Sequence, residues 1–340
     1  MLVPFIRSSL IGSYLVCEQK SFISYNIGLK EPGKFSTDSG SSVHKSLELL
    51  AQKKKAIQDG KTHIENEIFD KPYKLVDITQ ETAFELAWSY FRKTIPHKEW
   101  DEMDSKEKYR NMYYELLAGD YNPLKLNVIQ PEQYFDLTIE EDWARYSYNI
   151  QGEKYEGFLS IKGTMDLIFQ NDGYLSGMDY KTGKTRVDWA TGKIKNIDDL
   201  KKDKQLLLYS YAINRLFNVT DFSIIIYFLQ AGGPYEIPFD KTTLKTAYSM
   251  IKDFFWKISQ NTKPFLAKNS PNFFDKRKCN WCHFNKVDPK ISKNKTVCEY
   301  YDDGIVNLGM AKVIERHGDV NKIFSYGSGG GRSLTEKSIE

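Results

Sequence analysis

A tight turn between two strand-like runs is the feature that most constrains this chain. Residues 163–169 and 174–181 are rich in apolar and aromatic residues and flank the turn sequence Asn171-Asp172-Gly173. A turn of this composition between two such runs predicts a β-hairpin. Because side chains two positions apart on a strand share a face, we expect Asp179 and Lys181 to point the same way.

Further residues with the chemistry of a metal site surround this hairpin. Asp166 lies on its first run, so two carboxylates and a lysine are expected to converge on one sheet, where they can hold a divalent cation and stabilise charge on a phosphate. An exposed ion pair would also give the Asp-x-Lys pattern, so that pattern alone is a weak signal. Gln205 and Tyr209 share a helix face at i, i+4, and His44 opens an upstream helix.

Size and composition indicate an ordinary globular protein. The chain has 340 residues, enough for one large domain or two smaller ones, and 41% of them are hydrophobic. A net charge of +3 is too small to establish a nucleic-acid partner, so any basic footprint must be local. No apolar run reaches membrane-spanning length, and the N-terminus lacks a secretory signal pattern. We therefore expect a cytoplasmic protein without a membrane partner.

The order of the predicted elements indicates the fold class. Helices are expected at residues 43–57, capped by Ser42, and at 81–93, 98–117, 197–217 and 241–258. Strands are expected at 133–140, 144–150, 158–169, 174–181 and 222–229, with a short extended piece at 234–238. This order predicts an α/β core with a mixed sheet and an N-terminal helical elaboration.

Four regions are expected along the chain. They are an N-terminal helical region (1–125), a core (126–265), a cysteine segment (266–300) and a C-terminal extension (301–340) that includes the flexible glycine-rich stretch 327–331.

The four cysteines indicate a second metal site. They are Cys17, Cys279, Cys282 and Cys298. A reducing compartment argues against disulfides, and the Cys-x-x-Cys spacing is typical of metal ligands. Four thiolates fit structural zinc, and His283 could replace one of them.

The motifs together resemble a known family. They are Gly-x-x-Asp (Gly163 to Asp166), Asp-Tyr-Lys-Thr-Gly (Asp179 to Gly183), Gln-x-x-x-Tyr (Gln205 to Tyr209) and the upstream His44. Over about residues 8–300 the chain resembles the nuclease domain of RecB-type enzymes, within the PD-(D/E)XK superfamily. This resemblance implies a restriction-endonuclease-like mixed β-sheet core flanked by helices, and metal-dependent hydrolysis of DNA.

The resemblance also implies a role for each site residue. Asp166 and Asp179 would bind Mg²⁺ or Mn²⁺, joined by the backbone carbonyl of Tyr180 and by His44. Lys181 would orient or help to deprotonate the attacking water and offset charge on the phosphate.

Three further residues have less determined roles. Gln205 and Tyr209 would position the nucleic-acid strand or the lysine. Glu132, after Pro131, is either an additional acid of the site or a surface glutamate.

The placement of the cysteines resembles the iron–sulfur subset of RecB-type nucleases, which includes the AddB nuclease domain and the CRISPR-associated four-cysteine exonucleases. One cysteine precedes the nuclease motifs and three follow them. This arrangement implies a [4Fe–4S] cluster that staples the two ends of the domain, and it favours the cluster over zinc. Two features depart from the pattern: Glu18 stands where proline is usual, and the gap from Cys282 to Cys298 is long.

A lysine-rich stretch follows the catalytic motif. We expect Lys184, Arg186 and Lys204 to contact nucleic acid, although a solvated surface would look the same. The complete expectation is a metal-dependent deoxyribonuclease acting on single-stranded DNA or DNA ends in recombination, repair, replication or DNA processing. The chain has no ATP-binding loop of the Gly-x-x-x-x-Gly-Lys-Ser/Thr kind, so a helicase or recombination protein would be its partner. The alternative is a catalytically silent nuclease-fold DNA-binding or scaffolding module with structural zinc.

Overall fold

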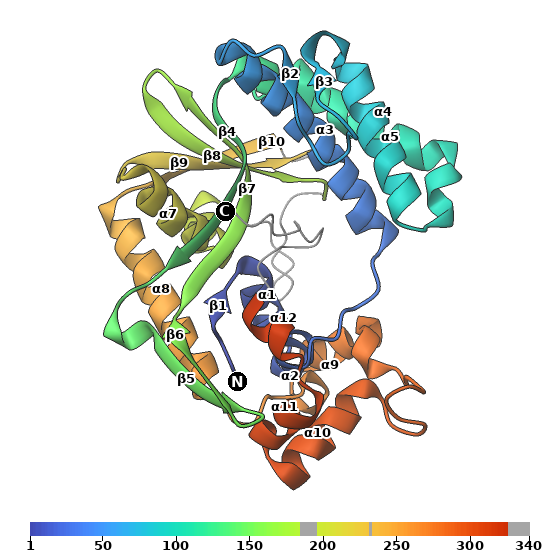
Figure 1. Cartoon of the computed structure of the whole chain (residues 1–340), viewed down its shortest axis with the longest axis vertical. Helices are drawn as coiled ribbons and strands as arrows, with labels where there is room; N and C mark the ends of the chain where they lie inside the picture. Colours follow the sequence, from blue (N-terminus) through green and yellow to red (C-terminus); the bar gives the residue numbers. More distant parts are fainter. Residues whose placement is uncertain (184–195, 231–232, 326–340) are drawn as a thin grey trace.

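A six-stranded mixed sheet forms the centre of the protein. The computed structural model describes residues 1–183, 196–230 and 233–325 (Figure 1). The strands of this sheet are β1 (Phe5–Ile6), β4 (Asn127–Thr138), β7 (Ser160–Asn171), β8 (Tyr174–Lys181), β9 (Phe222–Phe228) and β10 (Gly233–Phe239). Strand β7 pairs with β4 along one edge, and with β8 and β1 in succession along the other.

The sheet is mixed because its connections differ in length. The β7–β8 hairpin and the β9–β10 pair are antiparallel, whereas β8 and β9 are parallel and are joined through α6 (Ile197–Lys201) and α7 (Lys204–Phe217). Strand β9 lies between β8 and β10, and its run of isoleucines is buried on both faces, as expected for an interior strand. The predicted hairpin and mixed sheet are confirmed.

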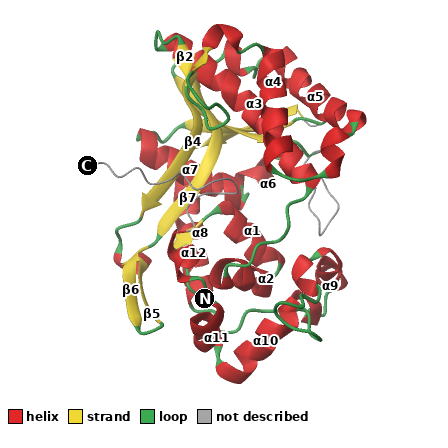
Figure 2. Cartoon of the chain, turned by 45° about the vertical axis from the view of Figure 1, so that its right-hand side comes forward, coloured by secondary structure: helices red, strands yellow, loops and turns green. Residues whose placement is uncertain are grey.

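Helices cover both faces of this sheet (Figures 1 and 2). One face packs on α7 and α8 (Lys241–Ser259), and the other packs on α3 (Phe35–Gln58), α4 (Gln80–Thr94) and α5 (Met103–Ala118). Alternation along β9 shows the two layers directly: Ile224 and Ile226 belong to the first hydrophobic core, and Ile225 belongs to the second.

Helices from both ends of the chain pack in the first core. They are α1 (Ser8–Val16), α2 (Glu18–Phe22), α10 (Val297–Leu308), α11 (Met310–His317) and α12 (Val320–Ser325), while α9 (Phe273–Lys278) follows a short 3₁₀ turn (Ala267–Asn269). Ile11 of α1 and Ile305 of α10 are both buried members of this core. Helix α10 spans residue 300, the expected end of the cysteine segment.

Two small antiparallel pairs lie outside the main sheet: β2 (His63–Ile64) with β3 (Tyr73–Lys74), and β5 (Arg145–Ile150) with β6 (Glu153–Phe158). The predicted strand at 144–150 is thus confirmed as β5, but it pairs with β6 rather than with the core. Among the described residues, no helix is long and apolar enough to cross a membrane.

Three predicted helices differ from the structure. The helix expected at 98–117 is a 3₁₀ turn (Lys98–Asp101) followed by α5, which begins at Met103. Helix α3 begins at Phe35, so Ser42 is not its cap. Ser42 lies inside the helix, and its hydroxyl donates to the backbone oxygen of Ser39 at 2.7 Å. The helix expected at 197–217 is broken in two, because the Asp203 carboxylate accepts a hydrogen bond from the Gln205 N–H and caps a new helix there.

Candidate active site

The site lies where two strands of the sheet diverge. The ladder between β7 and β8 ends with the pair Leu167 and Met178. The next residues in register are Asp166 and Asp179, which are not paired in this ladder. Instead, the N–H of Tyr180 donates to Asp166 Oδ2 at 2.7 Å, so a carboxylate takes the place of a backbone acceptor. The strand order therefore places two acidic side chains at the opening between the strands.

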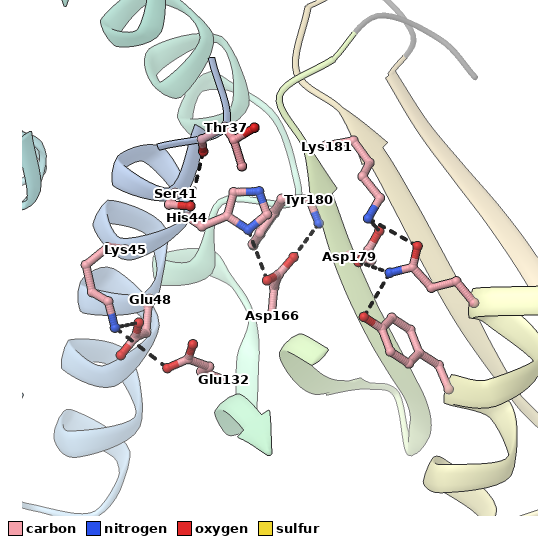
Figure 3. Close-up of polar contacts among 12 residues, drawn as sticks. Thr37, Ser41, His44, Lys45, Glu48, Glu132, Asp166, Asp179, Tyr180 and Lys181 are labelled. Carbon is pink, nitrogen blue, oxygen red and sulfur yellow. Dashed lines mark hydrogen bonds and ion pairs between the residues drawn. The ribbon is translucent and has the colours of Figure 1, made fainter. Parts of the chain in front are cut away.

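Asp179 belongs to a polar network with helix α7 (Figure 3). Its Oδ2 lies 2.6 Å from Lys181 Nζ, and its Oδ1 accepts a hydrogen bond from Gln205 Nε2 at 3.2 Å. The same Gln205 amide nitrogen donates to the Tyr209 hydroxyl at 2.9 Å, and Lys181 donates to Gln205 Oε1 at 3.4 Å. The structure thus brings these four predicted residues together, with Gln205 at the centre.

Asp166 is held from the other side of the sheet by helix α3 (Figure 3). His44 Nδ1 lies 3.0 Å from Asp166 Oδ1. Helix α3 comes this close because residue 40 is glycine: a Cβ at Gly40 would lie 2.6 Å from the Oγ1 of Thr182, which directly follows β8.

A second glycine supports the site from β7. A Cβ at Gly163 would lie 2.6 Å from Cζ of Phe135, so the buried Phe135 ring packs directly on the glycine backbone. That ring meets Tyr209 edge to face, with centroids 6.1 Å apart. Gly163, the glycine of the Gly-x-x-Asp motif, therefore leaves room for Phe135, and Phe135 in turn packs against Tyr209, the hydrogen-bond partner of Gln205.

The electrostatics of the two carboxylates differ. Burial raises the pKa of Asp179, the Lys181 ammonium opposes this rise, and the charge of Asp166 adds to it. Burial also disfavours the charged form of Asp166, but the charge and hydrogen bond of His44, with Lys181 and the Tyr180 N–H, hold its pKa below the usual range. The register of β7 and β8, which places Asp166 opposite Asp179, explains why the charge of Asp166 acts on Asp179.

His44 is the basic partner of Asp166. Burial alone would lower its pKa, but the charge and hydrogen bond of Asp166 outweigh burial and raise it. Since Nδ1 faces Asp166, the other ring nitrogen, Nε2, is the one that a metal would meet.

Comparison with known proteins identifies the family. The family model for the PD-(D/E)XK nuclease superfamily matches residues 9–287, which is most of the chain. The chain belongs to the PD-(D/E)XK nuclease superfamily. The matched range contains every carboxylate, lysine and amide of the site described above.

Individual relatives are distant. A subunit of the ATP-dependent helicase/nuclease from Bacillus pumilus (strain SAFR-032) is 29% identical over 111 residues, which are 32% of this chain and only 9% of that protein. A solved structure from Eubacterium rectale, described as a candidate exonuclease, aligns with a TM-score of 0.46 and 12% identity, covering 84% of this chain and 89% of that one. The structure of a protein named SSO0001 aligns with a TM-score of 0.26 and 16% identity, covering 71% and 94% of the two chains.

The donor set fits the hard divalent cations that this superfamily typically uses, Mg²⁺ or Mn²⁺. Asp166 and Asp179 offer carboxylate oxygens from adjacent strands, and oxygen donors are the preferred ligands of both ions. Within the described ranges, no three His, Cys, Asp or Glu side chains are already gathered as a complete metal cage. Water and substrate oxygens commonly complete a Mg²⁺ coordination sphere, so two carboxylates with an imidazole nearby are a compatible set.

Glu132 lies beside the site on β4. The β4–β7 register places Glu132 opposite Asp166, and its backbone is left-handed (φ 49°). The side chain of Glu132 is 46% exposed, and its carboxylate lies 3.7 Å from Lys45 Nζ. Lys45 is buried and also forms ion pairs with Glu48 and with Glu67, the latter at 2.8 Å. This buried cluster was not predicted from the sequence, although Lys45 directly follows His44 and Glu48 lies about one helical turn after Lys45.

The four cysteines come from both ends of the chain into one region, but no three of them are gathered as ligands of one metal in the described ranges. Cys17 is the N-cap residue of α2, Cys279 begins a short 3₁₀ turn, Cys282 lies between that turn and the next, and Cys298 is in the first turn of α10. Burial raises the pKa of the Cys298 thiol, and the charges of the other three cysteines raise it further. The backbone N–H of His283 donates to Glu31 at 3.2 Å.

The predicted basic contacts are described only in part. Lys184 and Arg186 lie outside the described residues. Lys204 is in the first turn of α7, directly before Gln205, and its pKa is lowered by burial and by the nearby Lys257. A lysine side chain therefore stands next to the polar network centred on Gln205.

Proposed function

We propose that this chain is a Mg²⁺- or Mn²⁺-dependent DNA exonuclease that acts on single-stranded DNA or on DNA ends. Membership of the superfamily supports a nuclease acting on DNA. The observation that carries the catalytic assignment is the connected set at the strand divergence: Asp166 and Asp179 side by side, with Lys181 paired to Asp179 at 2.6 Å. A silent binding module has no need to keep this set together.

The reaction is hydrolysis of a phosphodiester. A water oxygen forms a new bond to phosphorus, the bond from phosphorus to the leaving oxygen breaks, and the water's proton leaves as the leaving oxygen gains one. A bound divalent cation would polarise the phosphate and the attacking water. The Lys181 ammonium, about 31% exposed, can approach the phosphate oxygens and offset the charge that develops on them.

The remaining residues hold these groups in place. Gln205 contacts both Asp179 and Lys181, so it fixes the ammonium relative to the carboxylate. Tyr209 orients the Gln205 amide, and on the opposite side His44 fixes Asp166. Correct placement of this kind contributes strongly to rate.

We also propose that Cys17, Cys279, Cys282 and Cys298 hold a [4Fe–4S] cluster, with structural zinc as the alternative. The four thiols come from both ends of the chain, and their charges influence one another. Thiolate ligands suit either metal. The role would be structural, because such a site would tie α2 to α10.

The proposed substrate form rests on what the chain lacks and what it resembles. Its sequence has no ATP-binding loop, and the relative from Bacillus pumilus is named as part of a helicase/nuclease. We propose that a helicase or recombination partner opens the duplex and delivers a single strand to this nuclease.

The test is digestion of single- and double-stranded DNA labelled at either end, with Mg²⁺ or Mn²⁺. We expect the wild-type chain to release short products from an end, and Asp179→Asn to lower the rate at least about 100-fold. Asp198→Asn, which removes an exposed carboxylate from α6, is the matched control. Wild-type protein that binds DNA but cleaves it with neither metal would establish the silent module instead.

A further inference from the structure

Two adjacent residues of helix α3 attach it to two neighbouring strands of the sheet (Figure 3). His44 Nδ1 lies 3.0 Å from Asp166 Oδ1 on β7, and Lys45 Nζ lies 3.7 Å from Glu132 Oε2 on β4. The β4–β7 register places Glu132 opposite Asp166. Because directly opposite residues of an antiparallel pair share a face of the sheet, both attachments of α3 are on one face and at one level.

The ammonium of Lys45 is enclosed and has several partners. Its side chain is 9% exposed, and the ammonium also pairs with Glu48 and with Glu67, the latter at 2.8 Å. Glu48 is held in turn, since the amides of Gln52 and Asn66 each donate to its Oε1 at 2.9 Å. A buried charge is costly unless it is paired, so these contacts fix the ammonium in one place.

Glu132 meets this lysine from a strained backbone. Its φ of 49° is uncommon for a residue other than glycine. Such conformations persist where surrounding contacts determine them, and they cluster at functional sites. Among the described residues, Lys45 is the ion-pair partner of the Glu132 carboxylate. A strained residue that pairs with a buried lysine is a fixed contact, unlike the loose ion pairs of a protein surface.

The placement of His44 depends on how α3 lies on the sheet. The His44 side chain is 31% exposed, and its ring meets Tyr180 edge to face with centroids 6.1 Å apart, so packing encloses it only in part. Adjacent residues point about 100° apart around a helix. Attachments at both His44 and Lys45 therefore fix the rotation of α3 about its axis as well as its distance from the sheet.

We propose that Lys45 and Glu132 are positioning residues of the metal site. Their ion pair sets α3 on the β4–β7 strand pair so that the imidazole of His44 meets Asp166, and it acts on cation binding and on cleavage through His44. The inference rests on the proposed nuclease function and adds to it a role for the buried cluster. It also gives Glu132 a role other than that of an additional acid.

Two variants that break the ion pair change the charge in opposite directions. Lys45→Met removes a positive charge, Glu132→Gln removes a negative one, and both keep nearly the same side-chain volume. If charge alone mattered, Lys45→Met would tighten the binding of a divalent cation and Glu132→Gln would weaken it. A positioning role predicts that both variants weaken it.

The readout is the Mn²⁺ affinity of the DNA-free protein, measured by isothermal titration calorimetry, together with kcat for cleavage of labelled single-stranded DNA. We expect each variant to weaken Mn²⁺ binding about tenfold, as is found for residues that orient a metal ligand. The double variant Lys45→Met/Glu132→Gln should bind Mn²⁺ no more weakly than either single variant, because the ion pair is already broken.

Lys53→Met is the matched control. It removes the same charge from α3 at a lysine whose Nζ donates to the backbone oxygen of Ile78 at 2.7 Å, away from the sheet contacts of His44. The Mn²⁺ affinity of this variant should stay within about twofold of wild type.

A His44→Gln background separates a positioning role from a direct one. Since the ion pair acts through His44, neither Lys45→Met nor Glu132→Gln should change the Mn²⁺ affinity by more than about twofold in that background. If Glu132→Gln still weakens binding tenfold there, or if Lys45→Met tightens binding in the wild-type background, the inference is overturned.

Thermal denaturation shows whether each variant is folded. Glu132→Gln changes a side chain that is 46% exposed and leaves the buried pair of Lys45 and Glu48 intact, so it tests the inference even if Lys45→Met is unstable. Lys45→Met/Glu48→Gln also removes the buried carboxylate that loses its ammonium. Wild-type protein that binds Mn²⁺ but does not cleave DNA would refute the proposed function, whereas the inference fails on the Mn²⁺ affinities of the variants alone.

Discussion

Replacing Gly163 with alanine should disturb the active site without touching a catalytic residue. The added Cβ would lie 2.6 Å from Cζ of Phe135, and ordinary carbon–carbon contacts need roughly 3.5 Å or more. The buried ring must therefore move by about 1 Å, towards Tyr209, whose ring it meets edge to face. Overpacking of this kind costs about 1–3 kcal/mol, which for a chain of 340 residues corresponds to a fall in Tm of roughly 1–4 °C.

Catalysis should suffer more than stability. Tyr209 orients Gln205, and Gln205 contacts both Asp179 and Lys181. A displacement of about 1 Å in a positioning residue can lower the rate by about 100-fold. Thermal denaturation and end-labelled DNA cleavage measure the two effects on the same preparations.

A double-mutant cycle with Phe135→Leu tests the cause. The smaller side chain leaves room for the new methyl group, so Gly163→Ala should cost at least about 1 kcal/mol less in that background. Gly12→Ala is the control, because Gly12 lies outside the site motifs and a Cβ there would meet no atom of the described residues within 4 Å. If Gly163→Ala lowers stability equally in both backgrounds, or leaves cleavage intact, the proposed chain of contacts is wrong.

Three further predictions concern other parts of the site. Gly40→Ala should separate α3 from Thr182 and lower cleavage about tenfold or more, and Thr182→Ala, which removes the clashing Oγ1, should restore it; no rescue would contradict the close approach. Burial raises the pKa of Glu48 to about 8 from its ordinary value of 4.5, so the folded chain holds this proton more tightly than the unfolded chain. The stabilising contribution of this proton is complete below about pH 4.5 and is lost as the pH rises through about 8. The urea midpoint of unfolding should therefore fall over that pH window, and it should fall less in Glu48→Gln. An identical pH profile of the urea midpoint in the variant would refute this. Anaerobically purified protein should be brown and contain iron that Cys298→Ser lowers, whereas stoichiometric zinc without iron would assign the thiols to zinc.

The proposed catalytic set was predictable because the spacing of its residues along each strand or helix is local. A turn of Asn171-Asp172-Gly173 sets the hairpin, and the period of two then places Asp179 and Lys181 on one face. The period of 3.6 does the same for Gln205 and Tyr209 on α7. The expectation that these residues meet is consistent with the structure, since all four contact one another through Gln205.

Other features could not be read from local pattern. The stretch before His44 is rich in serine, glycine and aspartate, which favour loops, yet it forms the first turns of α3. Tertiary packing outweighs propensity here, because Ser39, Gly40 and Ser42 are all buried. The buried Lys45–Glu48 cluster was missed for a similar reason: charged residues are normally exposed, and only the packing of β4 against α3 encloses these.

The amino-acid sequence by itself determined which side chains share a strand face or a helix face, because that depends only on the repeat of the backbone. It also determined that the two strands of the hairpin are neighbours, and that carboxylate oxygens are available as metal ligands. Only the tertiary structure decided that β7 and β8 part after Leu167 and Met178, opening a space at Asp166 and Asp179. Only packing brought His44 from a remote helix and Cys17 from the opposite end of the chain to their neighbours, since contacts between distant segments depend on how whole layers bury their apolar faces.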